Sequence, residues 1–321
     1  NLWSDFNFAT NWLAGYSCLL FNLLVCKKIF QMNVSIILVN YNTHDLTQAC
    51  IDSIFEKTKD IEFEVILVDN DSKDGSQEIF SKDRRINFVE SGGNIGFGRA
   101  NNIGAKKATG KYIFFLNTDT LLVNNAIKYF YDYCEEHSHD KFGGIGCLLQ
   151  DKEGNNIHSF ARFPTLTSNL RDFLVAPIYK KLGKTYQRYD TTDDDVTKDS
   201  FRVDYVTGAD LFVSRELIDK CGAFDKDFFM YFEETEMQHR WTRNGNPSYI
   251  IKSPKIIHLE GGSVNKDHEQ FSPRKFVMGI KSAKLYMKKT HGTIYNFAYR
   301  IVNLLNIYVV YHHHFDGENK K

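Results

Sequence analysis

The apolar run VSIILV, at Val34 to Val39, decides the fold class of this chain. An unbroken run rich in β-branched residues is typical of a strand buried on both faces, as in a parallel sheet. A helical pattern follows it, because Leu46, Cys50 and Ile54 recur at helical spacing. A buried strand that leads into an amphipathic helix is the repeating unit of α/β proteins.

The same alternation continues along the first half of the chain. Further buried strands are expected at 65–68 (VILV), 86–89 and 112–116 (YIFFL), with helices at 100–108 and near 127–134. Strands that alternate with helices predict parallel βαβ units. We therefore expect an α/β protein with a mostly parallel, doubly wound sheet and helices on both faces.

Polar residues gather where three of the expected strands end. The clusters are Asn40-Tyr41-Asn42, Asp69-Asn70-Asp71 and Asn117-Thr118-Asp119. Each cluster alone also fits an ordinary turn, where Asn and Asp are common. Because ligands bind beyond the carboxyl ends of the strands in an open parallel sheet, all three together favour a binding site.

A glycine-rich segment, GGNIGFG at 92–98, precedes one of the expected helices. Backbone amides at such a helix start can hold phosphate. The glycines follow a GxxGxG order rather than the dinucleotide order GxGxxG, and the pair Gly110-Lys111 lacks the other residues of a P-loop. The sequence therefore supports neither an NAD enzyme nor a P-loop ATPase.

An apolar run at 228–232 leads directly into Glu233 and Glu234. Acids in the first turn of a helix, with Glu236 and Arg240 four residues apart, fit a well-capped surface helix. The apolar approach also fits an acid that is directed into a pocket. His258 follows a strand-like stretch, and a single histidine is more often structural than a metal ligand.

The bulk composition limits the function classes. The chain has 321 residues, with 40 basic and 40 acidic side chains, so a nucleic-acid partner is not expected. Six scattered cysteines form no CxxC pair, which favours reduced thiols in a cytosolic protein. The apolar run at 12–26 is shorter than the roughly 20 residues that span a bilayer, and residues 1–31 are treated as an extension.

Taken together, these stretches resemble glycosyltransferase family 2, and within it the rhamnosyltransferase-like bacterial enzymes of surface polysaccharide synthesis. The resemblance covers roughly residues 33–290 and rests on several ordered blocks, among them VDNDSKDGS at 68–76 and GGNIGFGRANNIGAKKATGKYIFFLNTDT at 92–120. It implies a GT-A fold. A domain at 32–275 would hold a nucleotide-binding half (32–150) and an acceptor half (151–275), followed by a helical tail at 276–321.

The resemblance also implies roles for particular residues. Asp69 matches an acid that contacts the base or ribose, and Asp119 matches the last acid of the DxD-type metal motif, whose first position here is Asn117. His258 matches a histidine that binds the metal in some members. The implied donor-binding residues are Asn40, Asn42, Asp69, Asn94, Asn101 and Asn117. The implied cofactor is a divalent metal, Mg²⁺ or Mn²⁺.

The acceptor side is implied by the block that begins VTGAD at 206–210. Its residues Gly208, Ala209 and Asp210 match the acceptor loop. Glu234 matches the second acid of the family's Glu-Asp pair, the general base, although Glu233 remains open as an alternative because Asp is commoner at that position.

The implied activity is inverting transfer of a sugar, with rhamnose a candidate, from a nucleotide diphosphate to a glycan or lipid-linked acceptor. A cytoplasmic location is expected. Lysines and apolar side chains in the tail predict peripheral contact with the inner face of the cell membrane. Two rival functions are another kind of nucleotide-sugar enzyme, such as a nucleotidyltransferase or epimerase, and a non-catalytic nucleotide-sugar-binding protein.

Overall fold

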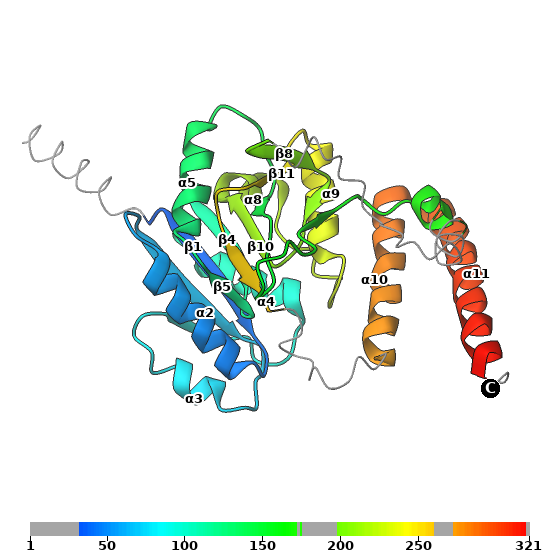
Figure 1. Cartoon of the computed structure of the whole chain (residues 1–321), viewed down its shortest axis with the longest axis horizontal. Coiled ribbons are helices and arrows are strands. Elements are labelled where there is room, and N and C mark those ends of the chain that lie inside the picture. Colours follow the sequence, from blue (N-terminus) through cyan, green and yellow to red (C-terminus); the bar gives the residue numbers. More distant parts are fainter. Residues whose placement is uncertain (1–31, 172–173, 175–197, 260–271, 319–321) are drawn as a thin grey trace, which may run out of the picture.

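The structure is a computed structural model that describes residues 32–171, 174, 198–259 and 272–318. Its centre is an eight-stranded sheet (Figure 1). The strands are β1 (Val34–Asn40), β2 (Phe63–Asp69), β3 (Asn87–Glu90), β4 (Tyr112–Asn117), β6 (Ile145–Cys147), β8 (Ser200–Val203), β10 (Asp210–Ser214) and β11 (Ser248–Ile251). Their order is β3-β2-β1-β4-β10-β6-β11-β8.

The directions of these strands place the candidate site. The strands β3, β2, β1 and β4 are parallel, as the sequence predicts, so their carboxyl ends share one edge of the sheet. Strand β10 runs antiparallel to β4, with Asp210 opposite Leu116. Because β10 is reversed, its first residue lies at the same edge as the last residues of β4.

Two short sheets flank this edge. Strand β5 (Thr120–Leu122) pairs with β12 (Ile256–His258). Strand β7 (Phe160–Ala161) pairs with β9 (Tyr205–Val206). In each pair, a strand that precedes residue 162 lies beside a strand that follows residue 204.

Helices cover both faces of the sheet, which confirms the predicted layers. One core packs the side chains of α2 (His44–Lys57) and α5 (Ala126–Glu136) against the sheet. The other packs α4 (Phe97–Lys107), α8 (Arg215–Cys221) and α9 (Glu233–Arg243) against the opposite face. The short α3 (Ser76–Phe80) follows β2.

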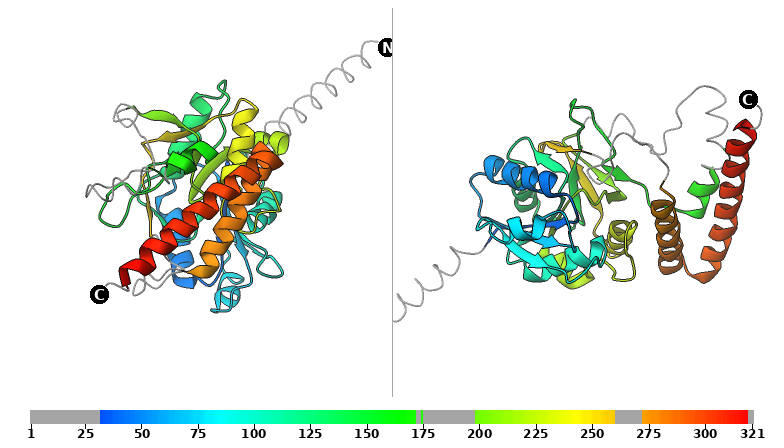
Figure 2. Two further views of the ribbon diagram at one scale, coloured as in Figure 1. Left: turned by 90° about the vertical axis from the view of Figure 1, so that its right-hand side faces the viewer. Right: turned by 90° about the horizontal axis from the view of Figure 1, so that it is seen from below.

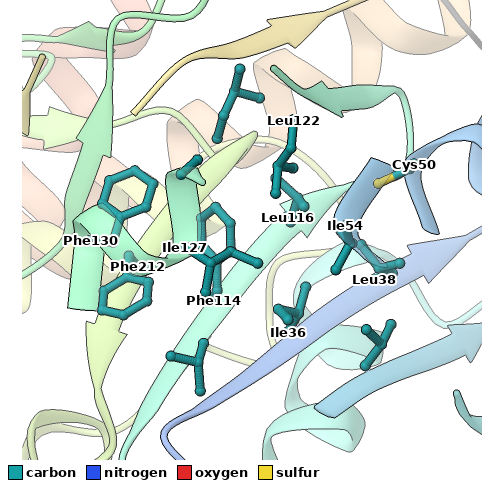
Figure 3. Close-up of a cluster of buried hydrophobic side chains, with 14 of the residues drawn as sticks. Ile36, Leu38, Cys50, Ile54, Phe114, Leu116, Leu122, Ile127, Phe130 and Phe212 are labelled. Atoms are coloured by element: carbon teal, nitrogen blue, oxygen red, sulfur yellow. The ribbon is translucent and has the colours of Figure 1, made fainter. Parts of the chain in front are cut away.

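Alternation along each strand supplies both cores. In β1, Ile36 and Leu38 belong to the core under α2 and α5, where Figure 3 shows them with Phe114, while Ile37 belongs to the core on the other face. Strands that bury alternate residues on both faces read as continuous apolar runs. Burial on both faces explains why the run VSIILV correctly predicts a strand inside the sheet.

The chain ends in a helical hairpin beside the core (Figure 2). It consists of α10 (Pro273–His291) and α11 (Thr293–Glu318), which confirms that the tail is helical. Helix α10 begins before residue 276, and its buried Ala283, Tyr286 and Met287 pack with Phe228. The division into domain and tail remains a prediction.

Several other predictions concern thiols and membrane segments. The described cysteines Cys50, Cys134, Cys147 and Cys221 are free thiols. Burial raises the pKa of Cys50 to about 12, as expected for a thiol that serves in packing.

Among the described segments, none of the helices has the length and apolar character needed to cross a bilayer. Residues 1–31 lie outside the described residues.

Candidate active site

Asn40 and Asp69 join the ends of the two neighbouring strands β1 and β2. The Asn40 amide donates to Asp69 Oδ2 at 2.9 Å and to Ser72 Oγ at 3.1 Å. Asp69 Oδ1 accepts from the Ser72 amide and from Gln77 Nε2, each at 2.9 Å. Both Asp69 and Asn40 are fully buried. These bonds fix the geometry at the ends of β1 and β2, and the predicted contact between Asp69 and a donor remains a prediction.

Asn42 and Asn94 lie at the exposed rim of the same edge. Asn42 has a left-handed backbone (φ 54°), and its side-chain oxygen accepts from the Lys73 amide at 2.6 Å. Asn70 donates to Asn94 Oδ1 at 3.2 Å and accepts from the Ile95 amide at 3.1 Å. The glycine-rich segment is therefore fastened to the end of β2, which brings Asn94 to the predicted donor side.

The start of α4 is occupied by another part of the chain. The Phe97 amide donates to the Phe229 carbonyl at 3.0 Å, so this amide is not free to hold phosphate as the sequence suggested. Gly96 has φ 91°, and a Cβ there would overlap the Phe229 carbonyl oxygen. The glycine order of this segment thus serves a close backbone approach. Asn101 is buried and donates to the Phe97 carbonyl, so its donor role remains a prediction.

Asp119 and His258 face each other at the edge of β5 and β12. Nε2 of His258 lies 3.2 Å from a carboxylate oxygen of Asp119, and both side chains are partly exposed. The buried Oδ1 of Asn117 has no hydrogen-bond partner. A carboxylate, an imidazole and a spare amide oxygen suit Mn²⁺ or Mg²⁺, especially with diphosphate oxygens as further ligands. In the described ranges no group of three or more His, Cys, Asp or Glu side chains is arranged to hold a metal.

Gly208 and Ala209 connect this metal candidate with the acids of α9. The Asn117 amide donates to the Ala209 carbonyl at 2.9 Å. A Cβ on Gly208 would lie 3.8 Å from Glu234 Cγ and 3.6 Å from the Phe97 ring. Gly208 and Ala209, which the sequence predicts to bind the acceptor, therefore lie between the end of β4 and Glu234.

Asp210 is the third residue of the predicted acceptor-binding group. It is fully buried, and its Oδ2 accepts from the Cys147 amide at 2.7 Å, while Oδ1 has no hydrogen-bond partner. Burial raises the pKa of Asp210 to about 7. Because its side chain is fully buried, a direct contact of Asp210 with an acceptor remains a prediction.

Glu233 and Glu234 differ in their surroundings. Glu233 is buried, its Oε2 has no partner, and burial followed by the charge of Glu234 raises its pKa well above the usual range. Glu234 is half-buried beside Gly208, and burial also raises its pKa. Since two adjacent carboxylates resist ionising together, we infer that Glu234 carries the charge and Glu233 the proton.

Tyr231 and Phe232 are site features that the sequence did not reveal. Both have left-handed backbone conformations, with φ 69° and φ 67°, directly before Glu233. Bulky residues seldom adopt this region, and such strain gathers at functional sites. An aromatic residue gives no sequence signal for a positive φ.

Comparison with known proteins decides the family. Residues 35–207, more than half of the chain, match the family Glycosyl transferase family 2. The chain belongs to this family and is a glycosyltransferase. Membership also excludes the rival nucleotidyltransferase and epimerase readings of the sequence.

Two curated relatives of this glycosyltransferase are rhamnosyltransferases. Rhamnosyltransferase WbbL of Escherichia coli K12 is 23% identical over 80% of this chain and 93% of its own length. The N-acetylglucosaminyl-diphospho-decaprenol L-rhamnosyltransferase of Mycobacterium tuberculosis is 23% identical over 63% of this chain and 68% of its own. The resemblance to rhamnosyltransferase-like members is thus confirmed, at low identity.

Solved structures confirm the GT-A fold. A Pyrobaculum calidifontis mannosyltransferase, in complex with GDP-Man and Mn²⁺, aligns with a TM-score of 0.54 at 14% identity, covering 86% of this chain and 71% of that one. GalNAc-T7 with UDP, GalNAc and Mn²⁺ aligns with a TM-score of 0.58 at 14% identity, covering 80% of this chain. The chain spans 48% of GalNAc-T7 and 20% of an uncharacterized Rickettsia bellii glycosyltransferase, so these proteins are much longer.

Proposed function

We propose that this glycosyltransferase moves a sugar, with rhamnose the first candidate, from a nucleoside diphosphate to a hydroxyl group of a glycan or lipid-linked acceptor, with inversion at the anomeric carbon. The rhamnosyltransferase names of the two curated relatives support the donor class. The mycobacterial name supports an acceptor in which a sugar is joined through diphosphate to a polyprenol.

One observation carries the proposal. Glu234 lies beside Gly208, and the next residue, Ala209, accepts a hydrogen bond from Asn117. Two residues beyond Asn117, Asp119 meets His258. A proton acceptor and a set of diphosphate or metal ligands are therefore separated by only a short bridge of backbone, as a group transfer between two bound substrates requires.

The chemistry follows from the charged groups. Glu234 takes the proton of the acceptor hydroxyl as the hydroxyl oxygen forms a bond with the anomeric carbon. The bond from that carbon to the diphosphate oxygen breaks, and the nucleoside diphosphate leaves with its electron pair. The burial that raises the pKa of Glu234 makes it a stronger proton acceptor than an exposed glutamate. The attack comes from the face opposite the leaving group, so the configuration inverts.

A divalent metal is part of this proposal. Asp119 and His258 would hold Mg²⁺ or Mn²⁺, and Asn117 Oδ1, a buried oxygen without a hydrogen-bond partner two residues before Asp119, is a further candidate ligand. The bound ion would offset the negative charge that grows on the diphosphate. Mn²⁺ in two structural relatives of the same fold supports this assignment.

The C-terminal hairpin suits contact with a membrane surface, where a lipid-linked acceptor would be found. The sequence 272–305 contains Lys and Arg residues but neither Asp nor Glu. Large apolar side chains are exposed on α11, with Ile294 89%, Phe297 63% and Leu304 63% exposed. Basic groups attract anionic headgroups and apolar groups enter the interface shallowly.

A transfer assay tests the function. The chain is incubated with Mn²⁺, nucleoside diphosphate-activated sugars including rhamnose, and an N-acetylglucosaminyl-diphosphoprenol acceptor. We expect a glycosylated lipid whose new linkage, read by NMR coupling constants, has the opposite anomeric configuration to the donor. Retained configuration would reject the inverting mechanism. If the rhamnose donor gave no product and another sugar donor did, only the donor assignment would change.

A further inference from the structure

The segment 222–232, which leads into the two acids of α9, is held along its whole length by three helices. Arg240 on α9 donates to the carbonyls of residues 221–223. On α4, Asn102 exchanges two hydrogen bonds with the backbone of Phe224, at 2.7 Å and 3.1 Å. Residues that precede a catalytic acid are thus fixed before the acid is reached.

Helix α10 supplies the contacts at the far end of this segment. Ser282 Oγ donates to the Met230 carbonyl at 2.7 Å, and Ser282 is buried. Phe228 is fully buried in the cluster formed by α10, and Phe232 packs on the Tyr286 ring at 5.6 Å. Lys289, near the end of α10, pairs with Asp225 and Asp227 at 2.7 Å each.

The Met230 carbonyl is the acceptor immediately before the two left-handed residues. Tyr231 and Phe232 cost free energy in that conformation and persist only if their neighbours hold them. On the α4 side the Phe229 carbonyl is held by the Phe97 amide, and on the α10 side the Met230 carbonyl is held by Ser282. Two successive carbonyls are therefore fastened to two different helices just before the strained turn.

We propose that Ser282 is a positioning residue for transfer: its hydroxyl holds the Met230 carbonyl, which keeps Tyr231 and Phe232 in the turn that directs Glu234 toward the acceptor. This assignment rests on Glu234 as the proposed base. It makes α10 a part of the catalytic apparatus, even though α10 supplies no group that reacts.

The test compares two serine-to-alanine variants on the same helix. Ser282→Ala removes the bond to Met230 with little change in volume. Ser272→Ala is the matched control, because Ser272 caps the start of α10 by accepting from the Lys275 amide, ten residues before the contact of Ser282 with Met230. Each full-length protein is assayed with the donor and metal that support wild-type turnover.

For Ser282→Ala we expect kcat to fall roughly fivefold to tenfold, the size expected from losing one buried hydrogen bond, with KM for the donor unchanged. The acid limb of the kcat profile should shift to lower pH, since a loosened turn lets water reach Glu234. Ser272→Ala should keep the wild-type kcat. Equal kcat values for Ser282→Ala and the wild type, or equal losses in both variants, would overturn the proposal.

Amide hydrogen exchange gives a readout that does not depend on turnover. Exchange at residues 231–234 should be faster in Ser282→Ala than in the wild type and in Ser272→Ala. Unchanged exchange at these amides would overturn the positioning role even if no donor supports transfer. Faster exchange in a protein without any transfer activity would retain the positioning role and reject the proposed function instead.

Discussion

Nε2 of His258 lies 3.2 Å from a carboxylate oxygen of Asp119, although the two residues come from opposite halves of the chain. The pairing of β12 with β5, which sets His258 opposite Thr120, brings them together. We expect Asp119→Asn to lose most turnover at low millimolar Mn²⁺ while its thermal unfolding stays near that of the wild type, because one hard oxygen ligand is lost.

A metal titration of the transfer rate checks this prediction. Asp132→Asn is the control, since it removes a surface carboxylate that pairs with Lys128 on α5. Wild-type rates for Asp119→Asn across the titration would remove Asp119 from the metal site.

The two acids of α9 should respond differently to loss of charge. Glu234→Gln keeps the shape and removes the proton acceptor, so kcat should fall by roughly 10²-fold or more while donor binding survives. Glu233→Gln should retain most activity, because burial raises the pKa of the Glu233 carboxyl and the neutral amide has the shape of the protonated acid. Steady-state kinetics with a donor-binding measurement separates the two. The reverse pattern would make Glu233 the base.

The wild-type rate should also depend on pH in a defined direction. The pKa of Glu234 is raised by burial, so a base with this pKa is lost as the pH falls through that raised value. We therefore expect the acid limb of kcat at a higher pH than the ordinary glutamate value of about 4.3. A limb at or below that value would contradict the burial of Glu234 in the active protein.

Gly96→Ala should disturb the catalytic turn from the donor side. The added methyl group would overlap the Phe229 carbonyl oxygen and would also be strained by the positive φ. Gly154→Ala has the same kind of φ, 85°, with nothing within 4 Å of the new Cβ, and so isolates the backbone cost of about 1–2 kcal/mol. We expect both variants to lose stability in urea and Gly96→Ala alone to lose kcat. Equal kcat values for the two variants would contradict this.

Asp210 should make stability depend on pH. Its pKa is raised by burial from 3.8 to about 7, so the folded protein binds a proton that the unfolded chain releases. The stabilising effect is complete below pH 4 and is lost as the pH rises to 7, at up to about 1.4 kcal/mol per pH unit. Asp210→Asn keeps an acceptor for the Cys147 amide and cannot ionise.

Urea unfolding at pH 5 and pH 8 checks this. Asp210→Asn should gain stability relative to the wild type as the pH rises between these values. A difference between the two proteins that does not change with pH would show that Asp210 titrates normally.

The hairpin should carry any attraction to membranes. We expect salt-sensitive binding to anionic vesicles that weakens when residues after about Thr290 are removed, and also in the less disruptive double variant Phe297→Ser with Leu304→Ser. Ile79→Ser, 47% exposed on α3, is the control. Vesicle flotation without binding, or binding unchanged by both alterations, would reject the hairpin as the contact.

The parallel half of the sheet could be predicted from the sequence because its strands are buried on both faces. The runs VSIILV and YIFFL are apolar apart from Ser35, and a run of this length between turn residues is shorter than a typical buried helix. The reversal of β10 could not be predicted. Its centre, LFV, is apolar like the centre of β4, and strand direction depends on the connection rather than on side-chain pattern.

The candidate site was predictable only where residues follow strand ends. Asn117 ends β4 as the pattern predicted, and Asp119 lies two residues beyond it, 3.2 Å from His258. The role of Asp119 and His258 as metal ligands remains a prediction. The contacts of Phe229 with Gly96 and of Met230 with Ser282 were not predictable, because they involve backbone carbonyls. Every residue has a carbonyl, so sequence does not distinguish the ones that are used.

The pairing of β7 with β9 has a consequence for how acceptor preference can change. Phe160 lies opposite Val206 and Ala161 opposite Tyr205, and β8, just before β9, pairs with β11 in the central sheet, so the chain is anchored both at β7 and at β8. When both ends of a loop are fixed side by side, a change in its length costs little extra entropy. A change of chain length between residues 162 and 199 would therefore leave β8 and the end of β4 in place, which would let relatives vary the acceptor they glycosylate while keeping the donor chemistry.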